Sequence, residues 1–130
     1  MPRDATGTGD AGPVGPRLTA GVRWSGATAV VTVTGELDRD TQEPLHAALA
    51  DALDRRPERV VVDCERLTFC DSTGLNLLLT ARLDAREAGS RLELAALRPP
   101  VDRAFGVTGV VTVFTVHDEL PAELAEGEHL

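Results

Sequence analysis

The 130-residue chain lacks lysine altogether and contains only two cysteines, and both scarcities exclude kinds of site. Without lysine there is no P-loop, because that motif needs a lysine to contact phosphates. The two thiols, Cys64 and Cys70, are too few for a disulfide framework, and their spacing matches no zinc motif. We therefore expect reduced and partly buried side chains. All thirteen basic residues are arginine, a bias typical of GC-rich bacterial genomes.

Long apolar runs and an excess of positive charge are also missing. No run of eighteen apolar residues occurs, so we expect no segment that spans a membrane. The first residues include Arg3, Asp4 and Asp10 where a secretory signal would be apolar, and we therefore expect a cytoplasmic protein. The formal net charge of -8 would repel a phosphate backbone, so we expect no nucleic-acid partner.

The composition predicts one globular domain between two short tails. Residues 1–16 are rich in Gly, Pro, Ala and Thr with almost nothing large to bury, which predicts a flexible N-terminal tail. Residues 17–126 are predicted to form the domain, and residues 127–130 a C-terminal tail. A hydrophobic content of 42% is sufficient for a domain of this length to bury its own core.

Hydrophobic periodicity predicts a mixed α/β fold. Two alternating stretches, 18–24 and 27–34, are separated by a short glycine turn and predict an N-terminal hairpin. Asp40 or Thr41 is expected to cap the helix that follows, with Pro44 in its first turn. Overall, the pattern predicts helices with apolar stripes at 45–53 and 75–83, shorter helices over 99–109 and 118–126, and strands at 59–64, 91–94 and 110–116. The alternation of strands and helices implies a largely parallel sheet.

The stretch Asp71-Ser72-Thr73-Gly74 lies between the valine-rich strand and a leucine-rich helix, and two interpretations of it stay open. In the structural one, the hydroxyl of Ser72 or Thr73 accepts a hydrogen bond from a free amide of the first helical turn. In the functional one, a hydroxyl here is a phosphoacceptor, because unpaired amides and the positive end of the macrodipole favour an anion at a helix N-terminus.

Three acidic residues, Glu36, Asp38 and Asp40, follow the second alternating stretch. A charged loop with a helix cap is sufficient to explain them. Alternatively, Asp38 lies near Ser72, because both residues follow strand ends that an α/β sheet brings to one edge. That edge is where a site is expected in this class of fold.

No motif in the chain indicates catalysis, a metal or a cofactor. The G-x-S-x-G motif is absent. The stretch at 71–74 is one residue too long for an aspartic protease and lacks the second copy that this mechanism requires. His46, His117 and His129 are expected to be solvated surface residues, which leaves no Ser/His or Cys/His pair. We therefore expect a protein that is not an enzyme and holds no metal or cofactor.

Three segments of the chain together resemble the anti-sigma-factor antagonists, which are single-domain members of the STAS superfamily. The segments are "VTGELDRDTQEPL", "LTFCDSTGLNLLL" and "VDRAFGVTGV", in the order that the family uses, and the resemblance covers about residues 17–120. It implies a single STAS-like α/β domain with a mixed sheet of four to five strands, four helices and an N-terminal hairpin. It also implies a regulatory protein of transcription.

By this resemblance, Ser72 is the serine that an anti-sigma factor phosphorylates, this factor being itself a serine kinase with a histidine-kinase-like fold. A PP2C-type phosphatase reverses the modification, and the unphosphorylated antagonist captures the anti-sigma factor so that a sigma factor is released. The family's partner-binding surface then corresponds to Asp38, Asp71, Ser72, Thr73, Gly74 and Asn76.

Two residues near this serine depart from the family pattern. Asn76 stands where the family commonly has a small residue, often glycine, so its side chain adds bulk and polarity to the docking surface one helical turn from Ser72. Cys70 stands where methionine is frequent and is expected to affect packing only. The alternative function is a STAS interaction module without phosphorylation, such as a scaffold subunit or ligand sensor, in which Ser72 only caps the helix.

Overall fold

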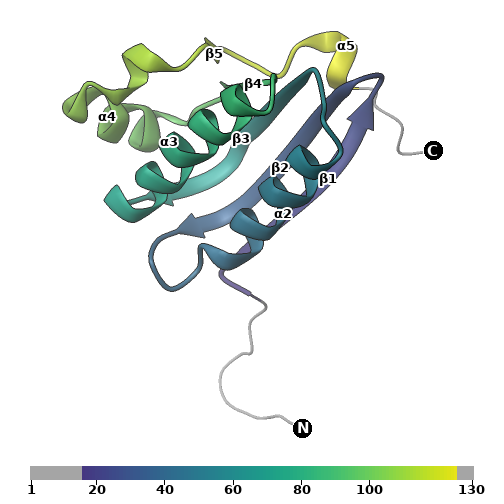
Figure 1. The fold of residues 1–130 in the computed structure, drawn as a ribbon. Helices are drawn as coiled ribbons and strands as arrows, with labels where there is room; N and C mark the ends of the chain where they lie inside the picture. Colours follow the sequence, from purple (N-terminus) through teal and green to yellow (C-terminus); the bar gives the residue numbers. More distant parts are fainter. Residues whose placement is uncertain (1–15, 126–130) are drawn as a thin grey trace, which may run out of the picture.

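The valine-rich segment forms the central strand of a five-stranded mixed sheet (Figure 1). The computed structural model describes residues 16–125, so that the predicted tails, apart from Pro16, lie outside the described residues. In spatial order the strands are β1 (Leu18–Ser25), β2 (Thr28–Leu37), β3 (Arg59–Cys70), β4 (Arg91–Ala95) and β5 (Val116–His117). β1 and β2 form the predicted antiparallel hairpin, and the other neighbours are parallel.

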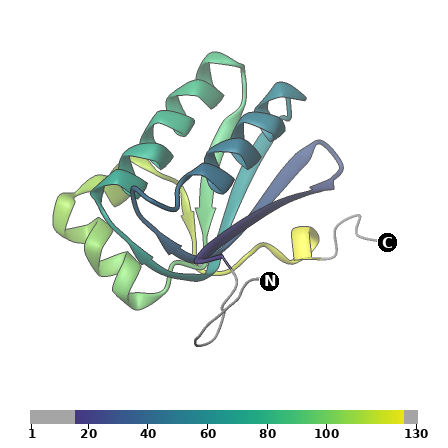
Figure 2. The ribbon, with the colours of Figure 1, turned by 90° about the horizontal axis from the view of Figure 1, so that it is seen from below.

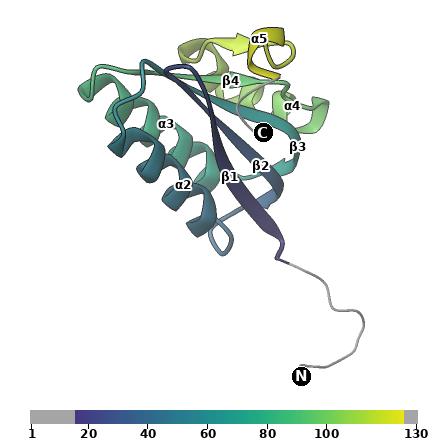
Figure 3. The ribbon, with the colours of Figure 1, turned by 90° about the vertical axis from the view of Figure 1, so that its right-hand side faces the viewer.

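Two long helices cover one face of this sheet. α2 (Glu43–Asp54) and α3 (Ser72–Glu87) lie side by side there, as Figure 2 shows from below. α4 (Pro99–Thr108) packs against β3, and a 3-10 turn, η2 (Val110–Val113), follows it. The four-residue α5 (Ala122–Ala125) lies on the opposite face (Figure 3). None of the helices within residues 16–125 has the length and apolar character needed to cross a membrane.

Alternation along the central strand divides the core into two unequal parts. Val60 and Val62 belong to the large cluster under α2 and α3, where Leu45 and Leu78 are also fully buried. The adjacent Val61 faces the other way and belongs to a small cluster beneath α5. That cluster consists of Val30, Val61, Ala95 and Leu124. Because both faces of β3 are covered, three consecutive valines are buried, which explains the apolar run in the sequence.

The predicted cap of α2 is wrong. The N-cap residue is Gln42, and no side chain hydrogen-bonds to the first turn, although Pro44 lies in that turn as predicted. Thr41 is used by the preceding loop instead. Its hydroxyl donates to the Glu36 carbonyl at 2.7 Å and accepts from the Asp38 amide at 2.9 Å. The loop after β2 thus competes successfully for the hydroxyl that helix-cap statistics assign to α2.

The predicted strand over 110–116 is also wrong for most of its length. Residues Val110–Val113 form a 3-10 turn after Gly109, which has a left-handed φ of 76°, and only Val116–His117 pairs with β4. β-branched composition favours a strand only where a partner edge is available. Here the chain must first bury Phe114, which is 7% exposed, in the main core. The predicted terminal helix over 118–126 shortens to α5, which begins after Pro121.

A charged cluster around Glu93 fastens β5 to the sheet. Glu93 is 7% exposed, and it accepts hydrogen bonds from His117 Nε2 at 2.9 Å and Arg91 Nε at 3.3 Å. Arg59 Nε lies 3.4 Å from the same carboxylate. Burial alone would raise the pKa of Glu93, but these partners outweigh it and lower the pKa. The expectation that His117 is a solvated surface residue is therefore wrong, whereas His46 is exposed and His129 lies outside the described residues.

Glu93→Gln is expected to lower the free energy of unfolding at pH 7 by about 1.5 to 3 kcal/mol, because it removes the charged acceptor to which Arg91 and His117 hydrogen-bond. The pKa of Glu93 is lowered in the folded chain. Its carboxylate therefore stabilises the fold above the pKa of the unfolded chain, and this contribution is lost as the pH falls through the folded value. Urea denaturation of both chains at pH 7 and in acid measures the difference, which should shrink in acid.

Glu58→Gln is the matched control, because Glu58 is exposed and its side chain makes no contact that fixes its charge among the described residues. It should leave the free energy of unfolding unchanged at both pH values. A deficit for Glu93→Gln that is the same at pH 7 and in acid would contradict the stabilising role of the carboxylate.

Candidate functional site

The parallel strands β2 and β3 end side by side at the start of α3 (Figure 1). Leu37 and Cys70, the last residues of the two strands, are register partners, and the Asp71 amide donates to the Leu37 carbonyl at 3.2 Å. Asp38 and Asp71 therefore follow directly on neighbouring strand ends. The sheet thus gathers at one edge the acidic loop after β2 and the hydroxyls that open α3.

Gly74 allows the first turn of α3 to approach these strand ends. A Cβ atom at this position would lie 2.6 Å from Leu37 Cγ and 2.9 Å from Cys70 Sγ, distances that real contacts do not show. Gly74 is buried, so its contribution to a binding surface is to seat the helix, and it presents no side chain to a partner. The resemblance implies that Gly74 is one of the partner-binding residues, and the structure shows that Gly74 is buried.

Asp71 caps α3, so of the two interpretations of this stretch the structural one, in which the hydroxyl of Ser72 or Thr73 caps the helix, is wrong. Asp71 has extended backbone angles, and its Oδ1 accepts a hydrogen bond from the Gly74 amide at 3.0 Å. Ser72 is the first residue of the helix and is exposed, Thr73 is half-buried, and Asn76 is exposed one turn further on. Among residues 16–125 no hydrogen bond holds the Ser72 hydroxyl, which is therefore available to a visiting molecule.

A shallow apolar hollow of about 170 Å³ adjoins Ser72, between the start of α3 and α4. Cys70 and Leu75 line it from one side and Phe105 from the other, with Asp71 and Ser72 at its rim. Burial and the nearby charge of Asp71 raise the pKa of the Cys70 thiol to about 12, so the thiol stays protonated at neutral pH and is a poor nucleophile. The Ser72 hydroxyl, by contrast, is exposed and can be reached by a partner.

Arg17 is a site residue that the sequence analysis missed. Its Nη2 donates to Asp38 Oδ2 at 2.6 Å and to Glu36 Oε1 at 3.1 Å. The contact between Arg17 and Glu36 could have been predicted from the hairpin. A two-residue turn that pairs Ser25 with Thr28 determines the register of all the residue pairs along both strands. Counted to its open end, this register places Arg17 opposite Glu36.

Gly35 makes room for this arrangement. It has a left-handed φ of 115°, and a Cβ there would collide with the Arg17 carbonyl oxygen. The register between β2 and β3 also shifts between Gly35 and Glu36. Such a bulge turns the side chains that follow, and here those are Glu36 and Asp38.

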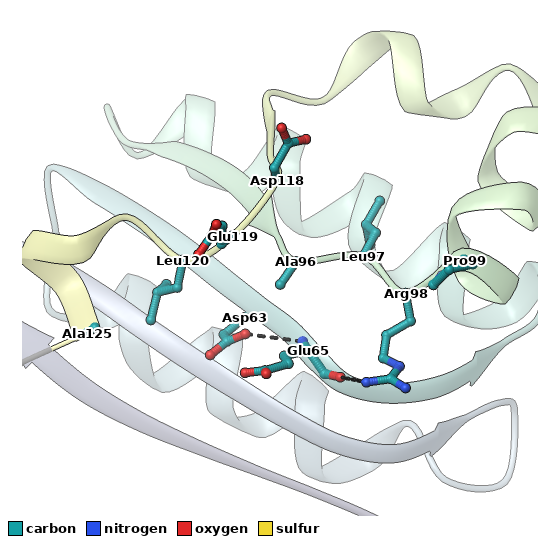
Figure 4. A pocket seen from close by; sticks show the side chains of 10 residues that line it. All are labelled: Asp63, Glu65, Ala96, Leu97, Arg98, Pro99, Asp118, Glu119, Leu120 and Ala125. Carbon is teal, nitrogen blue, oxygen red and sulfur yellow. Dashed lines mark hydrogen bonds between the residues drawn. The ribbon is translucent and has the colours of Figure 1, made fainter.

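A larger hollow lies elsewhere among the described residues. It measures about 520 Å³ and, as Figure 4 shows, is lined by side chains from β3, the segment that leads from β4 into α4, the segment before α5, and α5. Its charged lining residues are Asp63, Glu65, Arg98, Asp118 and Glu119. It shares no lining residue with the hollow beside Ser72. Among the residues that the structure describes, no group of His, Cys, Asp and Glu side chains has the arrangement of a metal site.

Comparison with known proteins identifies the family. Residues 20–118 match the family described as "Mlab, STAS domain". The chain belongs to the STAS domain family. The STAS domain therefore accounts for most of the chain, including the ends of β2 and β3, the serine that begins α3, and Gly74 in its first turn.

Individual relatives carry more specific names. The chain is 30% identical over 96 residues to a protein of Bordetella bronchiseptica named "Putative anti-sigma factor antagonist BtrV", covering 74% of this chain and 83% of that protein. It is 28% identical over 100 residues to the "Anti-sigma F factor antagonist" of Paenibacillus polymyxa, covering 76% and 86%. The crystal structure of an anti-sigma factor antagonist from Mycobacterium paratuberculosis superposes with a TM-score of 0.74 at 25% identity, covering 84% of this chain and 92% of that one.

These findings confirm the resemblance to the anti-sigma-factor antagonists and the predicted fold class. The mixed sheet has five strands, within the predicted range of four to five, and four helices accompany it within the described residues.

Gly74→Ala is expected to destabilise the chain by about 1 to 3 kcal/mol, because the added methyl group overlaps Leu37 and Cys70 in a packed region. Chemical denaturation measures the loss. Gly106→Ala is the matched control, since Gly106 lies in α4 with nothing within 4 Å of an added Cβ, and helix propensity predicts a neutral or slightly stabilising effect. Equal stabilities of the two alanine variants would show that the close approach at Gly74 does not constrain α3.

Proposed function

We propose that this chain is an anti-sigma factor antagonist that is controlled by phosphorylation of Ser72. Family membership and the names of the relatives support the antagonist role. The choice of Ser72 as the phosphorylated residue rests on the way in which α3 is capped. Asp71 supplies the capping oxygen, which leaves the exposed Ser72 hydroxyl without a structural task among the described residues.

In this proposal the unphosphorylated chain binds an anti-sigma factor in the cytoplasm and so releases a sigma factor. The anti-sigma factor is a serine kinase with a histidine-kinase-like fold. It transfers the γ-phosphoryl group of ATP to Ser72 Oγ, the hydroxyl proton leaves to a base of the kinase, and ADP is released. A PP2C-type phosphatase returns the serine by hydrolysis. The chain itself performs no catalysis, and it acts as the substrate and binding partner of these proteins.

In this proposal the partner surface is the edge around the serine, with Ser72 and Asn76 exposed, Asp38, Asp71 and Thr73 half-buried, and Gly74 buried beneath them. Asn76 lies one helical turn from Ser72 and is exposed, so an amide meets the partner at a position where the family commonly has a small residue. We expect this side chain to affect which kinase fits.

Added charge explains why phosphorylation would release the partner. A phosphate adds about -1.5 to -2 charges. The helix dipole stabilises this negative charge by only about 0.3 to 1 kcal/mol. A carboxylate ~6 Å away from a unit negative charge destabilises it by about 3 kcal/mol at an effective dielectric of ~20. Water screens this repulsion while the site is exposed, and the screening is lost once a partner covers it. A loss of about 3 to 4 kcal/mol lowers an affinity roughly a hundredfold to a thousandfold.

The phosphorylation of Ser72 is tested by incubating the chain with its kinase-active anti-sigma factor and ATP, followed by mass spectrometry. One phosphate on Ser72 is expected. Ser72→Ala should receive none and should bind the anti-sigma factor as tightly as the unmodified chain does, because it keeps the uncharged surface. Ser72→Asp should bind the anti-sigma factor at least about tenfold more weakly than the unmodified chain, since a carboxylate carries part of the phosphate's charge.

Thr80→Ala is the matched control, because Thr80 is an exposed hydroxyl further along α3, outside the proposed partner surface, and its removal should leave the extent of phosphorylation unchanged. Stable binding without any modification of Ser72 would favour the alternative, a STAS scaffold or sensor module without phosphorylation. Equal affinities of Ser72→Ala and Ser72→Asp would contradict the charge mechanism.

A further inference from the structure

Arg17, the residue before β1, reaches across the open end of the hairpin to two carboxylates. The Glu36 amide donates to the Arg17 carbonyl at 3.0 Å, which fixes the backbone from which the side chain projects. Arg17 Nη2 then donates to Glu36 Oε1 at 3.1 Å and to Asp38 Oδ2 at 2.6 Å. The shorter contact is therefore made with the residue that belongs to the proposed partner surface.

Asp38 is the more firmly held of the two carboxylates. Its side chain is 18% exposed, against 51% for Glu36. Its Oδ1 accepts from the Asp40 amide at 2.8 Å, so that its own loop holds one oxygen and Arg17 the other. Burial alone would raise the pKa of Asp38, but these hydrogen bonds outweigh it and lower the pKa. A carboxylate restrained at both oxygens presents a fixed acceptor to a partner.

Arg17 also offsets negative charge at the edge where Ser72 lies. Asp38 and Asp71 directly follow neighbouring strand ends. Glu36 immediately precedes the last residue of β2, and Asp40 lies two residues after Asp38. Within residues 16–125, the ion pairs at this edge both use Arg17, and the other ion pairs surround Glu93. Arg39 follows Asp38 directly in the chain, but it is exposed and forms no ion pair among the described residues.

We propose that Arg17 is a positioning residue of the switch, which holds Asp38 in place and offsets its charge, and thereby strengthens binding of the unphosphorylated chain to the anti-sigma factor. This inference rests on the proposed function, since it concerns the same partner and the same site. Without Arg17, Asp38 would be free to change rotamer and would carry an uncompensated charge. Both changes weaken a contact that depends on a preorganised acceptor.

The contact is tested in the isolated chain by following the Asp38 carboxyl carbon through an acid titration by NMR. In the wild type its midpoint should lie below the ordinary value of aspartate, and in Arg17→Gln it should move upward, because a hydrogen-bonded cation has been removed. Arg39→Gln is the matched control, since it removes the same charge next to Asp38 and breaks no ion pair. An unchanged Asp38 midpoint in Arg17→Gln would overturn the inference.

The consequence for binding is tested by a double-mutant cycle with the cognate anti-sigma factor. Arg17→Gln should weaken binding of the unphosphorylated chain roughly threefold to tenfold, and Arg39→Gln by less than about twofold. In an Asp38→Asn background, Arg17→Gln should cause no further loss, because Arg17 acts through Asp38. A loss of the same size in both backgrounds would overturn the inference, since it would show that Arg17 acts independently of Asp38.

The titration and the binding cycle give different results if the role of Arg17 fails and if the proposed function fails. If the wild-type chain fails to bind the anti-sigma factor, the proposed function is contradicted. The titration of Asp38 needs no partner, and it still decides whether Arg17 holds this carboxylate. Binding by the wild type together with an additive cycle contradicts the role of Arg17 and leaves the proposed function standing.

Discussion

The geometry of the site depends on the close approach between α3 and the ends of β2 and β3, which is possible because Gly74 has no side chain. Leu37 and Cys70 occupy the space that a Cβ would need. With the helix seated this closely, Asp71 reaches the Gly74 amide and caps the helix. The hydroxyl of Ser72 is then neither buried nor needed by the backbone. One steric fact thus accounts for the cap, the exposure of the serine and its place beside the acidic loop.

The carboxylates at this edge are already hydrogen-bonded or paired, so that one further negative group would be uncompensated. Asp71 satisfies a backbone amide, and Asp38 is held by Arg17 and by the amide of Asp40. The unmodified surface therefore has its carboxylates fixed and partly compensated. A phosphate on Ser72 would have no such partner already in place, because Arg17 is bonded to Asp38 and Glu36. On this account the switch acts through local electrostatics and leaves the folded domain as it is.

Sequence patterns predicted the parts of the fold that follow from periodicity, and missed those decided by competition between neighbours. The hairpin, the buried central strand and the glycine-ended helices were predictable because apolar spacing and turn chemistry determine them locally. Asp40 or Thr41 was expected to cap α2, but neither does, and the loop after β2 uses the hydroxyl of Thr41. Residues 110–116 have strand composition, yet burial of Phe114 and the short β4 edge leave only two residues paired. The contact of Arg17 with Glu36 and Asp38 could be predicted only from the strand register, because these residues lie far apart in the sequence.

In the proposed function, phosphorylation of Ser72 changes the charge of one edge without rearranging the domain. The most direct measurement is a comparison of backbone amide NMR spectra of the chain before and after phosphorylation. We expect chemical-shift changes confined to the ends of β2 and β3, the loop after β2 and the first turn of α3. Widespread shifts through the buried valines of β3 and through α2 would contradict this expectation, because they would show that the modification repacks the core.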